Sequence, residues 1–346
     1  MRLSFAESGA AILLPLTVIA VFPFPEGASA TGLALAWLVF MALAALPAAF
    51  LESALVRRAR QMPYPGIAQL TRDADARTAW RGLIPFSLVM LAALAALASA
   101  ATVDFMPAEP EWLGVAAPWL LLALASVMVW AGIEKLLGLG GLLAAGSIAV
   151  SLFLGESPLA FSLPDARGWQ HAAFLALLAG GSGIGLQAWL AQRRLADATA
   201  ASAVVPFLGV QAVSGVLIFM AGDLRHQPAA CAYVVPALFA VALMLHVLVQ
   251  QLTGKGYARP AALGAAVAVT GGLTFLAMQP TFGTLVQLLG LLPLLGLSLF
   301  AGWIMKISHV RKALNLPSEG VYNLWRVAVR LVVPGLCLWV MTGVFL

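Results

Sequence analysis

Charged residues are scarce in this chain. Asp, Glu, Lys and Arg make up 10% of its 346 residues, whereas hydrophobic residues make up 62%. Soluble domains carry about 25% charged residues. So few charges cannot cover the surface of a water-soluble protein, and the mean hydropathy of +0.98 agrees with this. The composition therefore excludes a soluble fold and indicates a protein embedded in a lipid bilayer.

Other residue types and motifs that carry chemistry are also missing. The chain has two cysteines, Cys231 and Cys337, in or near apolar stretches, which indicates apolar filling rather than disulfides or a metal site. The four histidines are too scattered to predict a zinc cluster. A Gly-x4-Gly-Lys-Ser/Thr loop is absent, which argues against ATP-driven transport. Interleaved basic and aromatic runs are absent too, so we expect no nucleic-acid partner, no cofactor and no enzymatic site.

Apolar stretches long enough to cross a bilayer recur along the whole chain. A membrane span needs roughly 20 mostly apolar residues. Such stretches lie near 8–25, 31–54, 83–103, 112–132, 137–154, 171–191, 203–221, 230–251, 259–278, 282–305 and 324–345. In lipid they must satisfy their own backbone hydrogen bonds, which predicts helices. We therefore predict an all-α integral membrane protein with about 11 transmembrane helices in a single membrane domain, residues 1–346.

The first stretch has a second interpretation. It ends in Ala-Ser-Ala at 28–30, which resembles the cleavage site of a secretory signal peptide. However, only one Arg precedes the stretch, and three prolines interrupt it. We therefore interpret it as a retained helix.

Basic residues are distributed unevenly over the predicted loops. With the spans alternating across the membrane, 17 of the 19 Lys and Arg residues fall on one side, and only Arg167 and Arg225 fall on the other. Positively charged loops stay in the cytoplasm, which predicts a cytoplasmic N-terminus and an outer C-terminus. The net charge of +5 follows from the same rule. The two longer cytoplasmic segments, 57–82 and 307–322, are expected to form short surface helices.

Two of the predicted spans are poor continuous helices. The first carries Pro15, Pro23 and Pro25, and the sixth carries four glycines within 180–185. Each glycine costs about 1 kcal/mol in a helix, yet glycines let a backbone unwind and offer its polar groups to a ligand. An unwound segment in the membrane must line a cavity or be buried in protein. The alternative for the glycines is close helix packing.

The number of spans suggests an internal repeat. Eleven spans divide into five, five and one, and many secondary transporters contain two five-helix units of opposite orientation whose first helices are broken. On this division the first repeat covers 1–155, the second covers 169–306, and the eleventh helix covers 322–346.

Several motifs resemble those of the neurotransmitter:sodium symporter family in its bacterial eleven-span form. The sixth span contains Gly183-Ile184-Gly185, similar to a Gly-x-Gly that follows an unwound segment in that family. "ALPAAFLESALVRRAR" resembles its Pro-x4-Glu with a basic exit and places Glu52 on the family's glutamate. "LFAGWIMK" and "LWRVAVRLVVPGLCLWV" are similar to its tenth and eleventh helices.

The resemblance runs nearly end to end and implies a LeuT-like fold in the bacterial inner membrane. It also implies uptake of an amino acid or amine, coupled to sodium, by alternating access around a mid-membrane site. The solute-binding residues that it implies lie on the first and sixth spans. These residues are Thr17, Val18, Ala20, Val21, Gly180, Gly181, Ser182, Gly183 and Gln187.

The chain departs from the family where ions are bound. The first span, "LTVIAVFPFP", lacks the family's Asn and Arg, and the third span lacks its Tyr. Leu238 and Phe239 replace a Thr-Ser pair in the eighth span, and residues 228–251 contain no Ser or Thr. Sodium requires several oxygen ligands. We therefore expect altered or absent sodium coupling and no resident metal.

Ionisable residues within spans are candidates for function. By resemblance, Glu52 braces the broken helix through hydrogen bonds rather than transferring protons. His246, in the middle of the eighth span, is a candidate proton or polar relay, with a neutral histidine bonded between helices as the alternative. Glu134 is expected to pair with Lys135 or to be solvated. Gln187, Gln211, Ser214, Gln250 and Gln287 either line a polar path or connect helices.

Two functional hypotheses follow. The first is a secondary-active, symporter-like transporter of a small organic solute, an amino acid or amine. The second is a degenerate relative that no longer transports and acts as a membrane partner or scaffold. The sequence does not define the oligomeric state.

Overall fold

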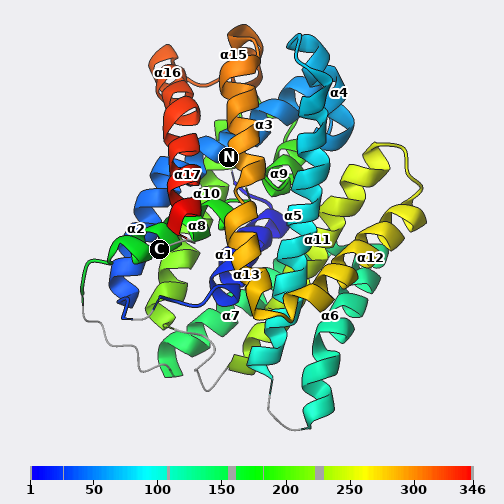
Figure 1. Ribbon diagram of the computed structural model, residues 1–346, viewed down its shortest axis with the longest axis vertical. Coiled ribbons are helices and arrows are strands. Elements are labelled where there is room, and N and C mark those ends of the chain that lie inside the picture. Colours follow the sequence, from blue (N-terminus) through cyan, green and yellow to red (C-terminus); the bar gives the residue numbers. More distant parts are fainter. Residues whose placement is uncertain are drawn as a thin grey trace.

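The computed structural model describes residues 2–25, 27–106, 110–154, 161–181, 183–222 and 230–343. Within these ranges every regular element is a helix, and the helices form one bundle (Figure 1). The prediction of an all-α membrane fold is therefore confirmed.

Helices of three kinds build the bundle. The α-helices are α1 (Phe5–Val21), α2 (Ala30–Phe40), α3 (Leu46–Ala59), α4 (Pro63–Asp73), α5 (Leu83–Ala100), α6 (Glu111–Ala131), α7 (Leu137–Leu154), α8 (Ala166–Ala179), α9 (Leu186–Arg193), α10 (Ala201–Ala221), α11 (Val234–Gly254), α12 (Arg259–Ala277), α13 (Pro280–Leu289), α14 (Leu292–Leu299), α15 (Ile307–Leu314), α16 (Glu319–Val327) and α17 (Val333–Thr342). The 3-10 helices are η2 (Thr78–Gly82), η3 (Ala101–Phe105), η4 (Ile133–Lys135) and η6 (Ala230–Tyr233). The π-helical turns are η1 (Met41–Ala45), η7 (Phe300–Ile304) and η8 (Ala328–Val332).

Nine continuous helices in the described ranges are long and apolar enough to cross a membrane. They correspond to nine of the eleven predicted spans. The other two are the spans that carry the prolines and the glycines: α1 is a shorter apolar helix of 17 residues, and the sixth span is divided into α8 and α9. Both segments therefore lack a full-length continuous helix.

Helix α1 begins with a capping box and ends earlier than predicted. The Ser4 hydroxyl accepts a hydrogen bond from the Glu7 amide at 3.3 Å, and Glu7 Oε2 accepts one from the Ser4 amide at 2.7 Å. The helix continues through Pro15 but stops at Val21, and Phe22 is extended. The predicted span 8–25 is wrong at this end, because a residue that precedes proline is pushed out of the helical region.

Glycines bring the backbones of α1 and α7 into direct contact. A Cβ atom on Gly9 would lie 2.0 Å from the Leu137 carbonyl oxygen, and one on Gly141 would lie 2.3 Å from Gly9 Cα. Such distances exclude any side chain at either position. The close contact holds α1 against α7 near the predicted cytoplasmic end.

The three π-helical turns interrupt neighbouring spans. Turn η1 lies in the second span, η7 in the tenth and η8 in the eleventh, and η8 contacts both of the others. Arg330 of η8 donates a hydrogen bond from Nε to the Gly302 carbonyl of η7 at 2.5 Å, and its guanidinium lies 4.9 Å from the Trp303 ring centroid. One side of the bundle thus contains all the π-helical turns in the described residues.

The basic segments meet at one end of the bundle. Arg57, at the end of α3, donates to the carbonyl oxygens of Arg194, Asp197 and Ala313 at 3.3, 2.6 and 2.8 Å. The surface helices predicted in 57–82 and 307–322 are α4 and α15, and both lie at the upper end in Figure 1. Segments that follow the second, sixth and tenth spans therefore share an end, as alternation requires. Which side of the membrane this end faces stays a prediction.

Candidate functional site

The sixth span is broken where the glycines lie. Helix α8 ends at Ala179 and α9 begins at Leu186. Between them Gly181, Gly183 and Gly185 have φ values of +66°, +85° and +96°. Residues that carry a Cβ atom rarely adopt this conformation. Ser182, which was predicted to bind solute, lies outside the described residues. The glycines are therefore needed for a change of backbone direction.

A buried carboxylate holds the side of this break at which α9 begins. Glu52 of α3 is 1% exposed, and its Oε1 and Oε2 accept hydrogen bonds from the amides of Gly185 and Ala188 at 2.9 and 2.8 Å. These amides belong to the first turn of α9, which has no helical acceptors for them. A negative charge at a helix N-terminus is also favourable. The contacts are those expected of a brace.

Two glutamines donate hydrogen bonds on the other side of the break, where α8 ends. Gln187 Nε2 donates to the Gly180 carbonyl at 2.5 Å, and Gln211 Nε2 donates to the Ala179 carbonyl at 2.6 Å. These carbonyls end α8 and would otherwise lack amide donors. Gln187 thus bonds across the break to the end of α8. Gln211 was expected either to line a polar path or to connect helices, and here it connects α10 to the end of α8.

The first span contributes a buried hydroxyl. Thr17, Val18, Ala20 and Val21 are all buried, and α1 packs against α8. Thr17 Oγ1 has no hydrogen-bond partner, whereas serines and threonines in helices usually bond a carbonyl one turn back. The Thr17 carbonyl accepts from the Tyr233 hydroxyl at 3.4 Å. An unpartnered buried hydroxyl is costly, and it is a position where a ligand would be stabilised.

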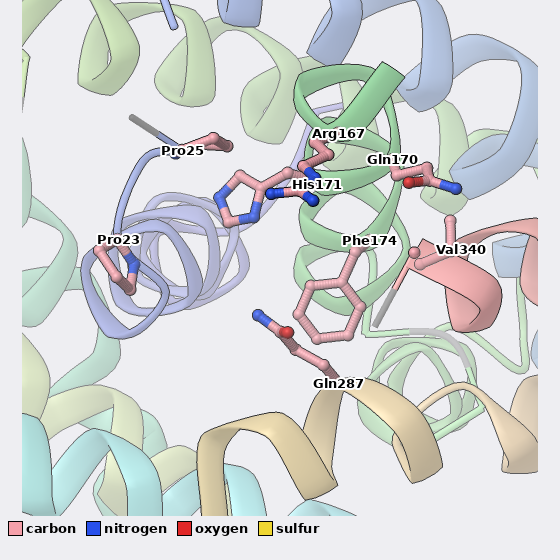
Figure 2. Close-up of a pocket in the computed structure, with 9 residues that line it drawn as sticks. Pro23, Pro25, Arg167, Gln170, His171, Phe174, Gln287 and Val340 are labelled. Atoms are coloured by element: carbon pink, nitrogen blue, oxygen red, sulfur yellow. The ribbon is translucent and has the colours of Figure 1, made fainter. Parts of the chain in front are cut away.

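Two cavities open where α1 ends and α8 and α13 begin, at the end of the bundle that is predicted to face outward. One of about 230 Å³ lies between Pro23, Pro25, His171, Phe174 and Gln287 (Figure 2). The other, of about 700 Å³, is lined by Val21, Phe22 and Asp104 among others, and Pro23 and Gln287 line both. Figure 2 shows the side chains of His171 and Gln287 directed into the space between the helices. Of the predicted solute-binding residues, Val21 lines the larger cavity.

Comparison with known proteins settles the fold. No family model and no curated protein matches the chain. Among solved structures, the crystal structure of MhsT in complex with L-phenylalanine matches it with a TM-score of 0.72 and 18% sequence identity, over 100% of this chain and 99% of that chain. The fold is LeuT-like. At this identity the likeness covers the fold alone, and the repeat boundaries at 1–155 and 169–306 stay a prediction.

At the opposite end of this LeuT-like bundle, ion pairs tie α1 to α9. Arg194, which follows α9, donates from Nε and Nη2 to the two carboxylate oxygens of Glu7 at 2.8 and 2.5 Å. Arg193 Nη1 binds Glu134 Oε2 at 2.5 Å. We call Glu7, Arg193, Arg194 and Glu134 the charge lock. Glu7 and Glu134 are far in sequence from Arg193 and Arg194, and these residues were not paired from the sequence; the Ser-x-x-Glu pattern at 4–7 is the one local signal that points to Glu7, as a helix cap.

The sequence suggested that Glu134 pairs with Lys135 or is solvated. In the structure Glu134 instead bonds Arg193 and His246. It lies in η4, where Oε1 contacts His246 Nε2 of α11 at 3.0 Å. The hydrogen bond with His246, aided by Arg193, lowers the pKa of Glu134 to about 2, although partial burial opposes the shift. The stabilisation from this lowered pKa is therefore present above about pH 4 and is lost as the pH falls towards 2.

Removal of the Glu7 charge should loosen the lock. Glu7→Gln leaves Arg194, 16% exposed, with only Asp197 Oδ2 at 4.0 Å as a charged partner, and we expect a loss of about 2–3 kcal/mol of stability, since a broken buried pair costs more than an exposed one. Thermal unfolding in detergent measures this loss. The matched control is Arg311→Gln, whose partner Glu319 is 68% exposed and whose loss should cost under about 1 kcal/mol. Equal effects of the two substitutions would contradict the prediction.

Proposed function

We propose that the protein is a secondary-active transporter of a small organic solute, an amino acid or amine, in a bacterial inner membrane. The observation that carries the proposal is the broken sixth span with a carboxylate brace on one side and amide caps on the other. Maintaining four costly glycines and a buried Glu52 is expected where a ligand must meet backbone in mid-membrane. The L-phenylalanine bound to MhsT supports an amino-acid-like solute.

The proposed solute position lies where α1 faces the break. Thr17 offers a buried hydroxyl without a partner, and Val18, Ala20 and Val21 offer an apolar wall. We propose that the solute reaches it from the two cavities at this end of α1, the larger of which is lined by Val21. We propose that Gly180, Gly181 and Gly183 lie on the facing side of the solute, as the resemblance implied. The charge lock closes the other end of the bundle, so this arrangement opens outward.

We further propose that sodium is not the coupled ion. At the eighth span, where the resemblance implied hydroxyl ligands, Phe239 packs its ring against Gly140 of α7, where a Cβ would come within 2.5 Å of the ring. An aromatic ring there supplies no oxygen. Sodium needs several oxygen ligands at once, and residues 228–251 contain no Ser or Thr.

The test is solute uptake by the purified protein in liposomes. We expect uptake of at least one member of an amino-acid and amine panel, with equal rates when choline replaces sodium. A rate that falls about tenfold without sodium would contradict the claim about the ion. Empty liposomes and protein heated above its unfolding temperature are the controls.

The scaffold hypothesis makes the opposite prediction for the same measurements. A degenerate relative would show no uptake of any solute and no increase in melting temperature with any panel member, because a ligand that binds only the folded state raises stability. That result, obtained with folded protein, would overturn the transport proposal.

A further inference from the structure

Two buried carboxamide oxygens at the broken sixth span have no hydrogen-bond partner. Gln187 and Gln211 use Nε2 on the carbonyls of Gly180 and Ala179, and Oε1 of both side chains is left unpaired. A carbonyl oxygen only accepts hydrogen bonds, so the amide nitrogen must face it and the orientation of each carboxamide is fixed. The two carbonyls belong to consecutive residues, so the carboxamides lie side by side. Both side chains are at most 1% exposed, and such acceptors are costly unless a ligand supplies donors.

The first span adds a third unpaired oxygen at the proposed solute position. Thr17 Oγ1 is buried without a partner, and α1 packs against both α8 and α10, the helix that carries Gln211. A hydroxyl can accept a hydrogen bond as well as donate one. A solute group with several N–H donors can therefore be received by Thr17 together with the two glutamines.

The backbone amides that could bind an anion at the break are already occupied. Glu52 accepts hydrogen bonds from the amides of Gly185 and Ala188, and the amides of Gly183 and Gln187 also face it. Helix α1 continues without interruption from residue 5 to residue 21, so its amides beside the break bond within the helix. The end of α8 presents the negative end of its helix dipole. A solute carboxylate therefore has no donor among these groups.

Cationic side chains lie away from the break. Helices α1, α5, α10 and α14 contain no Lys, Arg or His. Arg167 and His171 are in the first turns of α8, at least about two turns before its end, and Arg193 is the last residue of α9. Trp189 Nε1 is an unpaired donor, but its ring lies against the Arg193 guanidinium in the charge lock. In the described part of the chain, Glu52 is the charged side chain that meets the break.

We propose that the solute is a positively charged amine that carries no carboxylate. Its N–H groups donate to the unpaired oxygens of Gln187, Gln211 and Thr17, and its charge lies at the negative end of α8. The inference rests on the proposed transport function for the position of the solute, and it narrows the solute class from an amino acid or amine to an amine.

A carboxylate on the solute is disfavoured for two reasons. A charge that is buried without a partner is costly, and the site offers neither a free amide nor a cation. Glu52 also carries a charge of the same sign. We therefore expect an amine to bind at least about 100-fold more tightly than the amino acid that differs from it by one carboxylate.

The test compares ligands that differ in one charged group. L-Phenylalanine, which is the ligand in the MhsT structure, is compared with phenylethylamine, which lacks the carboxylate, and with phenylpropionate, which lacks the amine. The corresponding series for leucine and alanine cover smaller side chains. Calorimetric titration of the purified protein in detergent gives each affinity. We expect the amine of at least one series to bind, its amino acid to bind at least about 100-fold more weakly, and its acid not to bind.

A methylated amine separates the hydrogen bonds from the charge. The trimethylammonium form of the amine that binds keeps the positive charge but has no N–H group. Since a hydrogen bond from a charged donor is lost, we expect its affinity to be lower by at least about tenfold. Equal affinities of the two forms would contradict the role assigned to the unpaired oxygens.

Thr17→Val and Thr270→Val form a matched pair of variants. Both hydroxyls are buried and unpaired, but Thr270 lies on α12, which packs on α5, α6 and α11. Removing an unpaired hydroxyl should leave each protein at least as stable as the parent. Only Thr17→Val should weaken amine binding, by about tenfold. Gln211→Met, of similar length but without an acceptor, should weaken it at least as much.

The outcomes separate this inference from the transport proposal. Tighter or equal binding of the amino acid, or parental amine affinity in Thr17→Val and Gln211→Met, overturns the inference and leaves transport standing. Tight amine binding without uptake in liposomes supports the inference and contradicts transport. If no amine and no amino acid binds the folded protein, both proposals fall.

Discussion

Glu52→Gln is expected to abolish uptake and to destabilise the fold, with a cost of about 3 kcal/mol. The carboxylate accepts hydrogen bonds from the Gly185 and Ala188 amides with both oxygens. Glutamine keeps one oxygen but turns an NH2 group towards the other amide, so two donors face each other in a buried site. The charge that favours the α9 N-terminus is lost as well.

Thermal unfolding and liposome uptake together measure the Glu52 effect. Ser53→Ala is the matched control, because Ser53 is the adjacent buried polar residue of α3 and, among the described residues, no hydrogen bond joins it to the break. We expect that control to keep uptake and nearly all stability. Glu52→Gln protein with the melting temperature and uptake of the parent would show that the brace is dispensable.

Gly183→Ala should have an effect of similar size for a different reason. Gly183 has φ of +85°, a conformation that costs other residues about 1–2 kcal/mol. A Cβ there would also lie 2.7 Å from the backbone nitrogen of Leu294 in α14, and overpacking of this kind costs about 1–3 kcal/mol. Neither backbone can withdraw without moving its helix. We therefore expect a loss of about 3 kcal/mol and a severe loss of uptake.

Gly209→Ala separates the conformational requirement from a general effect of glycine. Gly209 lies in α10, where an added Cβ meets no atom within 4 Å. Alanine is the better helix former by about 1 kcal/mol, so this variant should be as stable as the parent or more so. If both alanine variants behaved alike, the left-handed backbone at the break would carry no functional weight.

Sequence reasoning succeeded where the signal was local and continuous. Apolar length revealed the spans, and clustered glycines marked the break, because both patterns are read within one segment. The end of α1 was also legible, since Pro23 restricts Phe22, but counting apolar residues extended the span to Pro25. The LeuT-like fold came from motif order rather than from composition.

The charge lock could not be predicted because its contacts are long-range. Glu7 and Arg194 are 187 residues apart, and Glu134 and His246 are 112 apart. A sequence gives the distance between neighbours on one helix, but not which loop comes to rest beside which helix end. Glu134 was assigned to adjacent Lys135 or to solvent for this reason. The tertiary fold gave it Arg193 and His246 instead.

The three π-helical turns set the rotational phase of the spans that contain them. A π turn is an α-helix that carries one residue more than its hydrogen bonds require. Removing a residue from Met41–Ala45, Phe300–Ile304 or Ala328–Val332 would restore an ordinary helix and rotate everything beyond it by about 100°. Because η8 contacts both η1 and η7, such a rotation in one span would change the surface it presents to the others. We therefore expect a one-residue deletion at any of these turns to keep the helix and to change the surface at which the second, tenth and eleventh spans meet.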